Sequence, residues 1–319
     1  MNQARRVLLA ASIVCPLMAA AQTYPTKPIR LIVPVPAGVG PDIDSRQIAP
    51  RLASLLGQPV IVENRPGAST RIAIEVAAKS APDGYTFLLG TSSFGTVQAL
   101  YAKLPFDTRR DFAPVSLLST TAYLLTVNAS VPAQTVSSYV ALTKSNPAHA
   151  NLATFGVGTL PHLAGVWFAS ITGADFKFIH YNTTPPYNDL VAGQTAALFE
   201  AILPLVGNVK AGKLRELALS GGKRHPLLPD VPTFAEAGVA NYDPSVWAGV
   251  LAPAGTARPI IQRVSAMLAQ VAQTPEIVAF RRDAGSVSLG STPDEFAAFL
   301  DAEREKWGKV IQGIGLKLE

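Results

Sequence analysis

Short apolar runs alternate with amphipathic segments along the first part of the chain. Apolar, partly β-branched runs at 29–35, 60–64 and 85–89 predict strands. Helical periodicity at 42–56 and 71–79 predicts helices between them. Strands that alternate with helices favour a parallel sheet, so this region is predicted to be an α/β unit.

Pro50 falls inside the first predicted helix, where we expect it to kink the helix or to start a new segment. A strand at 117–128 then leads into a second series of the same kind. The elements predicted there are helices at 137–144 and 162–172 and strands at 152–155, 176–180 and 196–199. A turn at 229–233 is followed by a short predicted helix that ends at Gly238.

The last part of the chain is predicted to return to the first unit. A strand at 247–253 precedes helices at 260–271 and 275–284, and Thr292-Pro293-Asp294-Glu295 has the pattern of a capping box. Two crossings between two α/β units predict two lobes joined by a hinge, with a cleft between them. The predicted boundaries are lobe 1 at 22–123 plus 247–319 and lobe 2 at 124–246.

Residues 1–21 have the pattern of a secretory signal peptide. Arg5 and Arg6 precede a mostly apolar stretch at 7–18, and three alanines at 19–21 end it. Cys15, the only cysteine, lies inside this segment after Ile13 and Val14, which argues against lipidation. We therefore expect a mature protein without thiols in the periplasm.

Composition narrows the class of protein. Hydrophobic residues make up 48% and charged residues 15% of the 319 residues, which fits globular lobes with large cores. The net charge of +5 is small and no run of Lys and Arg occurs, so nucleic acid is not an expected partner. The four histidines have no metal-ligand spacing, and neither a metal nor a cofactor is expected.

Three predicted strands of the first unit end in loops of small or hydrogen-bonding residues, at 37–42, 67–70 and 91–93. In parallel sheets ligands bind beyond the carboxyl ends of the strands. A helix N-terminus presents unpaired N–H groups and favours an anion, so the first loop is interpreted as half of a carboxylate site. Asp42 is interpreted as a cap or as a residue that orders this loop, because two anions repel.

Short motifs along the mature chain resemble the Bug family, the extracytoplasmic solute-binding proteins of tripartite tricarboxylate transporters. They include Val62-Glu63-Asn64-Arg65-Pro66-Gly67-Ala68, Ala81-Pro82-Asp83-Gly84-Tyr85-Thr86, Leu228-Pro229-Asp230-Val231-Pro232-Thr233 and Leu251-Ala252-Pro253-Ala254-Gly255-Thr256. The resemblance implies a type II periplasmic-binding-protein fold that traps a small organic acid and delivers it to a membrane permease. It implies no catalytic residue and, in our interpretation, a monomer.

The resemblance also implies which residues line the ligand. In lobe 1 they are Ala37, Gly38, Val39, Gly40, Asp42, Ser69, Thr70, Thr91, Ser92 and Ser93. In lobe 2 they are Gly156, Val157, Gly158, Thr159, His162, Tyr181, Asn182 and Thr183. His162, Tyr181 and Arg71 are left open between ligand contact and a structural role, while Phe94 and Phe199 are expected in the core.

Several positions depart from the family pattern. Val39, Ser69 and Thr70 replace common glycines, Val157 and Leu160 replace polar residues, Asn182-Thr183 replaces Lys-Gly, and Glu200-Ala201 replaces Asp-Asn. These changes make parts of the expected pocket more apolar. We therefore expect an aromatic or otherwise apolar carboxylate rather than a compact, highly charged acid.

Two other classes of function were weighed. Gly38-Val39-Gly40 begins a dinucleotide fingerprint, but Ile43 occupies the third glycine position, and no Gly-x-Ser-x-Gly motif indicates a hydrolase. An enzyme is therefore not expected. A sensor that presents its ligand to a receptor kinase would use the same cleft, so this alternative stays open.

Overall fold

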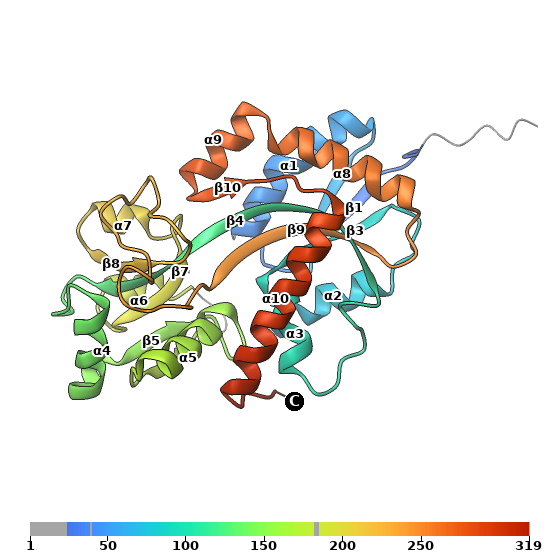
Figure 1. Ribbon diagram of the computed structural model, residues 1–319. Coiled ribbons are helices and arrows are strands. Elements are labelled where there is room, and N and C mark those ends of the chain that lie inside the picture. The colour runs from blue at the N-terminus through green and yellow to red at the C-terminus, as the bar shows by residue number, and fades with distance from the viewer. Residues whose placement is uncertain (1–23, 39, 182–184, 319) are drawn as a thin grey trace, which may run out of the picture.

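The computed structural model describes residues 24–38, 40–181 and 185–318 (Figure 1). The predicted signal segment, Val39, Asn182 and Thr183 lie outside the described residues. Ten strands form one curved sheet in the order β2-β1-β3-β9-β4-β7-β5-β6, with β8 and β10 each paired to β4. The α/β class predicted from the alternating pattern is confirmed.

The first lobe begins with three parallel strands that alternate with helices. The strands are β1 (Ile29–Val33), β2 (Val60–Asn64) and β3 (Thr86–Thr91), and the helices are α1 (Gly40–Leu56), α2 (Arg71–Ala78) and α3 (Ser92–Leu100). Val33 is in register with Asn64, so β1 and β2 end at the same edge of the sheet. The loops after both strands therefore lie side by side.

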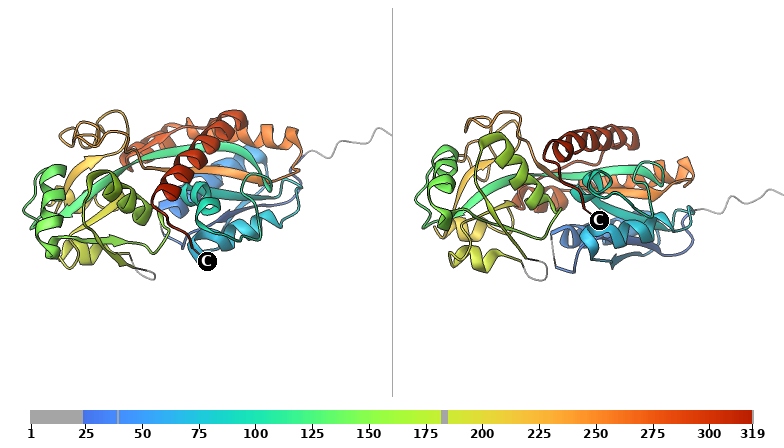
Figure 2. Two further views of the ribbon diagram at one scale, coloured as in Figure 1. Left: turned by 60° about the horizontal axis from the view of Figure 1, so that its bottom comes forward. Right: turned by 90° about the horizontal axis from the view of Figure 1, so that it is seen from below.

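The second lobe repeats this arrangement around β5 (Asn151–Thr154), β6 (Lys177–His180) and β7 (Ala197–Ala201), which are mutually parallel. Its helices are α4 (Val136–Ser145), α5 (Leu160–Thr172), α6 (Tyr187–Val191) and α7 (Val206–Lys210), and β8 (Leu214–Leu219) completes its sheet. Figure 2 shows the two groups of elements as separate bodies joined by long strands.

The connection between the lobes is made by β4 (Phe112–Asn128) and β9 (Ser245–Pro253). β4 pairs with β9 up to Ala122 and with β7 from Tyr123 onward, so one strand belongs to both lobes. The lobe boundaries near 123 and 247 remain a prediction. The change of the strand partner of β4 at Tyr123 supports them.

The C-terminal part returns to the first lobe as α8 (Arg258–Ala272), α9 (Pro275–Asp283), β10 (Ser286–Ser288) and α10 (Pro293–Gly313). The capping box is confirmed, because the Thr292 hydroxyl accepts the Glu295 N–H and the Glu295 carboxylate accepts the Thr292 N–H. α10 packs on α3 and β4, and Trp307 meets Trp167 of α5 with ring centroids 5.5 Å apart. This helix therefore also contacts the second lobe.

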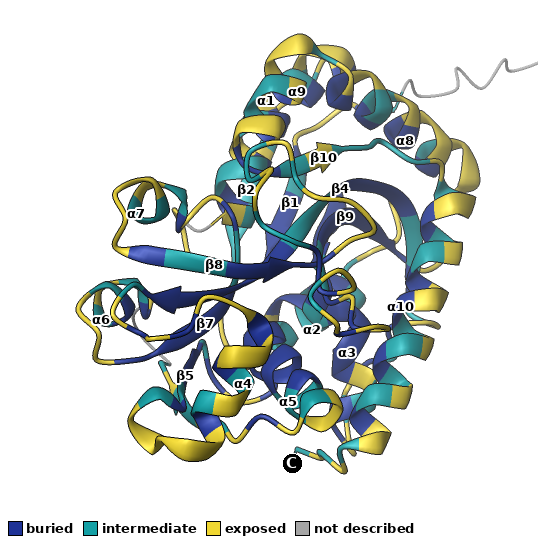
Figure 3. Cartoon of the chain, turned by 60° about the vertical axis from the view of Figure 1, so that its left-hand side comes forward, coloured by how far each residue is buried: buried dark blue, intermediate teal, exposed yellow. Residues whose placement is uncertain are grey.

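Helices cover both faces of the first-lobe sheet, as the buried inner sides in Figure 3 show. Leu31 and Val250 pack with α1 and α8, while Ile32 and Leu251 pack with α2, α3 and α10. The alternation of these neighbouring residues follows the two-residue period of a strand. Burial on both faces also explains why the strands are continuous apolar runs in the sequence.

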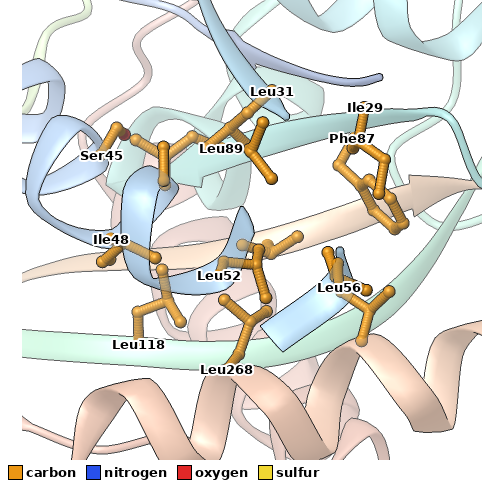
Figure 4. Close-up of a pocket in the computed structure, with 14 residues that line it drawn as sticks. Ile29, Leu31, Ser45, Ile48, Leu52, Leu56, Phe87, Leu89, Leu118 and Leu268 are labelled. Atoms are coloured by element: carbon orange, nitrogen blue, oxygen red, sulfur yellow. The ribbon is translucent and has the colours of Figure 1, made fainter. Parts of the chain in front are cut away.

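A cavity of about 20 Å³ lies between α1 and strands β1 and β3 (Figure 4). Its lining is apolar apart from Ser45, whose hydroxyl donates to the Pro41 carbonyl. A second cavity lies beside Ala99 of α3 and Gly308 of α10. None of the residues that line these two cavities is a predicted site residue.

Some predicted elements were wrong. α1 continues through Pro50, which is exposed, so of the two expected effects the start of a new segment is excluded, and the kink stays a prediction. Ser92 and Ser93 begin a helix that the loop-like sequence concealed, and the short helix expected before Gly238 is a series of turns. β8 and β10 were missed, because their pairing with β4 is a long-range feature.

Candidate functional site

Asp42 organises the loop between β1 and α1. The residue is 1% exposed, and its Oδ2 accepts the Gly38 N–H at 2.8 Å. Oδ1 accepts the Asn64 side-chain amide at 2.8 Å, and Arg46 Nε lies 3.0 Å from both oxygens. Burial alone would raise the pKa of Asp42, but the bonds from Arg46, Gly38 and Asn64 lower it. The interpretation of Asp42 as a residue that orders the loop is confirmed.

The ordered loop is open to solvent on its outer side. Ala37, Gly38 and Gly40 are exposed, and Gly38 has φ +84°, which favours glycine. Asn64 also donates to the Val35 carbonyl at 3.0 Å, which joins this loop to the end of β2. Exposed main-chain groups near the start of α1 are what an anion site at a helix N-terminus needs.

The segment after β2 has an unusual backbone. Ala68, Ser69 and Thr70 have φ values of +46°, +52° and +75°, although none is glycine. Such left-handed residues cost about 1–2 kcal/mol each. Thr70 Oγ1 is buried and has no hydrogen-bond partner among the described residues. Strained residues of this kind cluster at binding sites, and Ser69 and Thr70 are predicted site residues.

The predicted loop residues at 91–93 are the end of β3 and the start of α3, and they have different roles. The Ser92 hydroxyl donates to the Ser245 carbonyl and accepts the Trp247 N–H, both at 3.1 Å, so Ser92 ties α3 to β9. Thr91 and Ser93 are half-buried. Phe94, 1% exposed, lies in the core as expected. Ser92 thus connects the site to a strand that crosses between the lobes.

In the second lobe, the loop after β5 turns at two glycines with positive φ, Gly156 at +118° and Gly158 at +77°. The Thr159 hydroxyl donates to the Gly156 carbonyl at 2.7 Å, which closes the turn. Val157 projects from it with 42% of its surface exposed, whereas Leu160 is buried. The turn therefore presents one apolar side chain to solvent.

His162 stabilises this turn through a hydrogen bond. It is 7% exposed, and its Nδ1 accepts the Gly158 N–H at 3.1 Å. Burial, and then the nearby charge of His180, lower the pKa of His162 to about 4, so the ring is neutral at pH 7. The neutral tautomer that accepts this bond carries its proton on Nε2.

Tyr181 follows β6, and its hydroxyl donates to Asp189 Oδ2 at 2.7 Å. Burial, then the bond and the charge of Asp189, raise the pKa of Tyr181 to about 12. Tyr181 is half-buried. Phe199 is fully buried, as expected of a core residue.

Glu200 near the end of β7 was identified in the sequence only as a departure from the family pattern, and its hydrogen-bond partners come from the fold. The Tyr187 hydroxyl donates to Oε2 at 3.1 Å and the Ala201 N–H donates to Oε1 at 2.7 Å. Burial nevertheless raises the pKa of Glu200 to about 7. Tyr187, six residues after the predicted Tyr181, was the available signal, but its proximity to Glu200 depends on the fold.

The predicted second-lobe turn packs against residues of the first lobe. A Cβ atom on Gly158 would lie 2.7 Å from Leu318 Cδ1 and 3.4 Å from Leu100 Cδ1, so the second-lobe turn touches the first lobe. Within residues 24–38, 40–181 and 185–318, no group of three or more His, Cys, Asp or Glu side chains could hold a metal ion. The same described part contains no helix long and apolar enough to cross a membrane.

Comparisons with known proteins show the family to which the chain belongs. The model of the tripartite tricarboxylate transporter family receptor matches residues 45–316, and the chain belongs to that family. Its fold is the type II periplasmic-binding-protein fold expected from the motifs.

The chain is 33% identical over 302 residues to the protein BugT of Bordetella pertussis, with 94% of this chain and 93% of BugT covered. Similar solved structures include the following three. The periplasmic binding protein BugD has a TM-score of 0.84 at 27% identity and covers 92% of this chain and all of its own. An R. palustris protein with adipate has a TM-score of 0.85 at 30% identity, with 92% and 100% covered. MatC from Rhodopseudomonas palustris with bound malate has a TM-score of 0.83 at 28% identity, with 90% and 100% covered.

Proposed function

We propose that this chain is a periplasmic receptor that captures a small organic carboxylate between its lobes and delivers it to the permease of a tripartite tricarboxylate transporter. The observation that carries this proposal is the loop of Gly38, ordered by the Asp42 carboxylate at the end of β1. It holds main-chain groups in place beside the start of α1, where an anion is favoured. The adipate and malate complexes of similar proteins support a carboxylate as the ligand.

The energy of such a site is adequate without a metal. The helix N-terminus contributes roughly 0.3–1 kcal/mol, and each hydrogen bond to a charged acceptor about 1.5–3 kcal/mol. A few such contacts reach the roughly −8 kcal/mol of micromolar binding. The protein binds and releases its ligand unchanged, acts as a monomer, and needs no cofactor.

The second lobe favours an apolar part in the ligand. Val157 is 42% exposed at the tip of the turn, and Tyr181 lies at the end of the neighbouring strand β6. In this proposal, these side chains contact the carbon skeleton while the lobe 1 loop binds a carboxylate. Aromatic or long aliphatic acids should therefore bind more tightly than compact, highly charged acids.

The test uses the mature chain, residues 22–319, in a thermal-shift screen followed by calorimetry. The panel contains adipate, malate, hexanoate, benzoate, citrate and glutamate. We expect at least one acid with an apolar skeleton to bind at micromolar concentration. Tight binding of citrate or glutamate alone would contradict the apolar preference, and turnover of any acid would contradict the receptor function.

A further inference from the structure

Arg71 is the first residue of α2 and follows the left-handed segment Ala68–Thr70 directly. Three consecutive residues with positive φ fix the direction in which this helix begins. The side chain then folds back, so that Arg71 Nε donates to the Ala68 carbonyl at 3.1 Å. The strained segment and the arginine thus form one local unit.

The guanidinium of Arg71 also stacks on an aromatic ring. Its central carbon lies 4.0 Å from the centroid of the Tyr101 ring, and Tyr101 is only 8% exposed. A stacked guanidinium keeps its planar edge available for a carboxylate, which it binds with two parallel N–H···O bonds. Within the described part of the chain, the hydrogen bonds of this side chain use Nε only.

The ion pairing of Arg71 differs from that of the neighbouring arginines. Arg46 pairs with Asp42 at 3.0 Å, and Arg65 pairs with Glu63. Among the residues that the structure describes, no carboxylate pairs with Arg71. Of these three arginines near the ends of β1 and β2, Arg71 alone has a positive charge that no described acid balances.

Tyr101 places this charge beside the second lobe. It forms a parallel bridge with Leu318, and the Leu318 N–H donates to the Leu100 carbonyl at 2.8 Å. Leu100 and Leu318 are the residues that touch Gly158 of the second-lobe turn. Arg71 thus directly follows the predicted lobe 1 segment in the chain. The Tyr101 ring on which it stacks is linked through Leu318 to the predicted lobe 2 turn.

We propose that Arg71 binds a second carboxylate of the ligand, so that the receptor takes dicarboxylates with an apolar spacer. This inference rests on the proposed function, which assigns the first carboxylate to the loop ordered by Asp42. One acid group then binds main-chain N–H groups, the other binds a guanidinium, and the spacer lies against Val157.

The experiment compares acids that differ only in the second carboxylate. Succinate and butanoate, adipate and hexanoate, and terephthalate and benzoate are titrated into the wild-type chain and the Arg71→Gln variant by calorimetry. For at least one pair, the wild type should bind the diacid about tenfold or more tightly than the monoacid, which corresponds to about 1.4 kcal/mol. In Arg71→Gln this preference should disappear, while monoacid affinity changes by less than about threefold.

Two outcomes would overturn the inference: no pair in which the wild type prefers the diacid, or equal weakening of both members of a pair in Arg71→Gln. Binding of monoacids alone would leave the proposed function intact, whereas a wild-type chain that binds no acid would overturn the proposed function itself. Arg71→Lys keeps the charge without the planar edge, so we expect a diacid affinity between those of the wild type and Arg71→Gln.

Two variants control the experiment. Arg65→Gln removes a neighbouring arginine that already pairs with Glu63, and diacid binding should stay within about threefold of the wild type. Glu319 follows Leu318 in the sequence and lies outside the described residues. In a Glu319→Gln background the effect of Arg71→Gln should persist, and its loss there would show that Arg71 serves the chain's own acid instead of the ligand.

Discussion

The ring of His162 accepts the main-chain N–H of Gly158 at 3.1 Å. The bond crosses one turn, from the start of α5 to the loop that precedes it. Because His162 is buried and neutral, this loop depends on an uncharged imidazole for its conformation. A residue left open between ligand contact and structure thus has a clear structural role.

The first prediction concerns this bond. His162→Phe leaves the buried Gly158 N–H without an acceptor, which should cost about 1–3 kcal/mol of stability and weaken acid binding. His162→Asn retains an acceptor at a similar position and should lose clearly less. Urea denaturation and calorimetry measure both quantities, and equal losses in the two variants would contradict the role of the bond.

The second prediction concerns pH. The folded-state pKa of Glu200 is about 7, above its ordinary value of 4.5, so folding favours the protonated form. This contribution to stability is complete below about pH 4.5 and is lost as the pH rises through 7. Glu200→Gln should therefore match the wild type at pH 4.5 and exceed its stability by roughly 1–3 kcal/mol at pH 8.

Thermal unfolding across this range checks the effect. Glu276, an exposed acid at the start of α9, provides the control, because Glu276→Gln should shift the melting temperature little at either pH. A stabilisation by Glu200→Gln that is the same at pH 4.5 and pH 8 would show that packing, not ionisation, is responsible.

The third prediction concerns Asp42. Asp42→Ala removes the acceptor of the Gly38 N–H and of the Asn64 amide, which should cost roughly 1.5–3 kcal/mol. Acid affinity should fall with it, because the first-lobe loop loses its order. Asp83, which pairs with Lys27 on the surface, is the matched control, and Asp83→Ala should cost under about 1 kcal/mol. Unchanged ligand affinity in a folded Asp42→Ala protein would separate this loop from the site.

The fourth prediction concerns the left-handed segment. Ser69→Gly and Thr70→Gly relieve positive φ values, and each should stabilise the protein by roughly 0.5–1 kcal/mol after the entropy cost of glycine. Both should weaken diacid binding, because the direction of Arg71 is less fixed. Asn241→Gly, at φ +60°, is the control: asparagine tolerates this conformation, so little stability should be gained. Chemical denaturation would contradict the argument if the two loop variants were less stable than the wild type.

Local signals predicted much of the fold. The bounds of β2 and the capping box before α10 follow from a continuous apolar run and a four-residue motif. The family motifs, spread along the mature chain, also predicted the fold class correctly. These features are encoded within a few residues, which is why the sequence alone sufficed.

The site was harder to predict, because its residues are defined by distant partners. Ser92 has the appearance of a loop hydroxyl, yet it bonds to Ser245 and Trp247. The stacking of Arg71 on Tyr101 likewise joins the first residue of α2 to the residue that follows α3. Hydrophobic periodicity reports which face of an element is buried, but it does not report which residues it meets.

β4 has a further consequence, since its first half pairs with β9 and its second half with β7 and β8. Unfolding of either lobe would remove a hydrogen-bonded partner strand of β4 from the lobe that remains folded. The protein should therefore melt as a single cooperative unit, with one calorimetric peak whose calorimetric and van 't Hoff enthalpies agree.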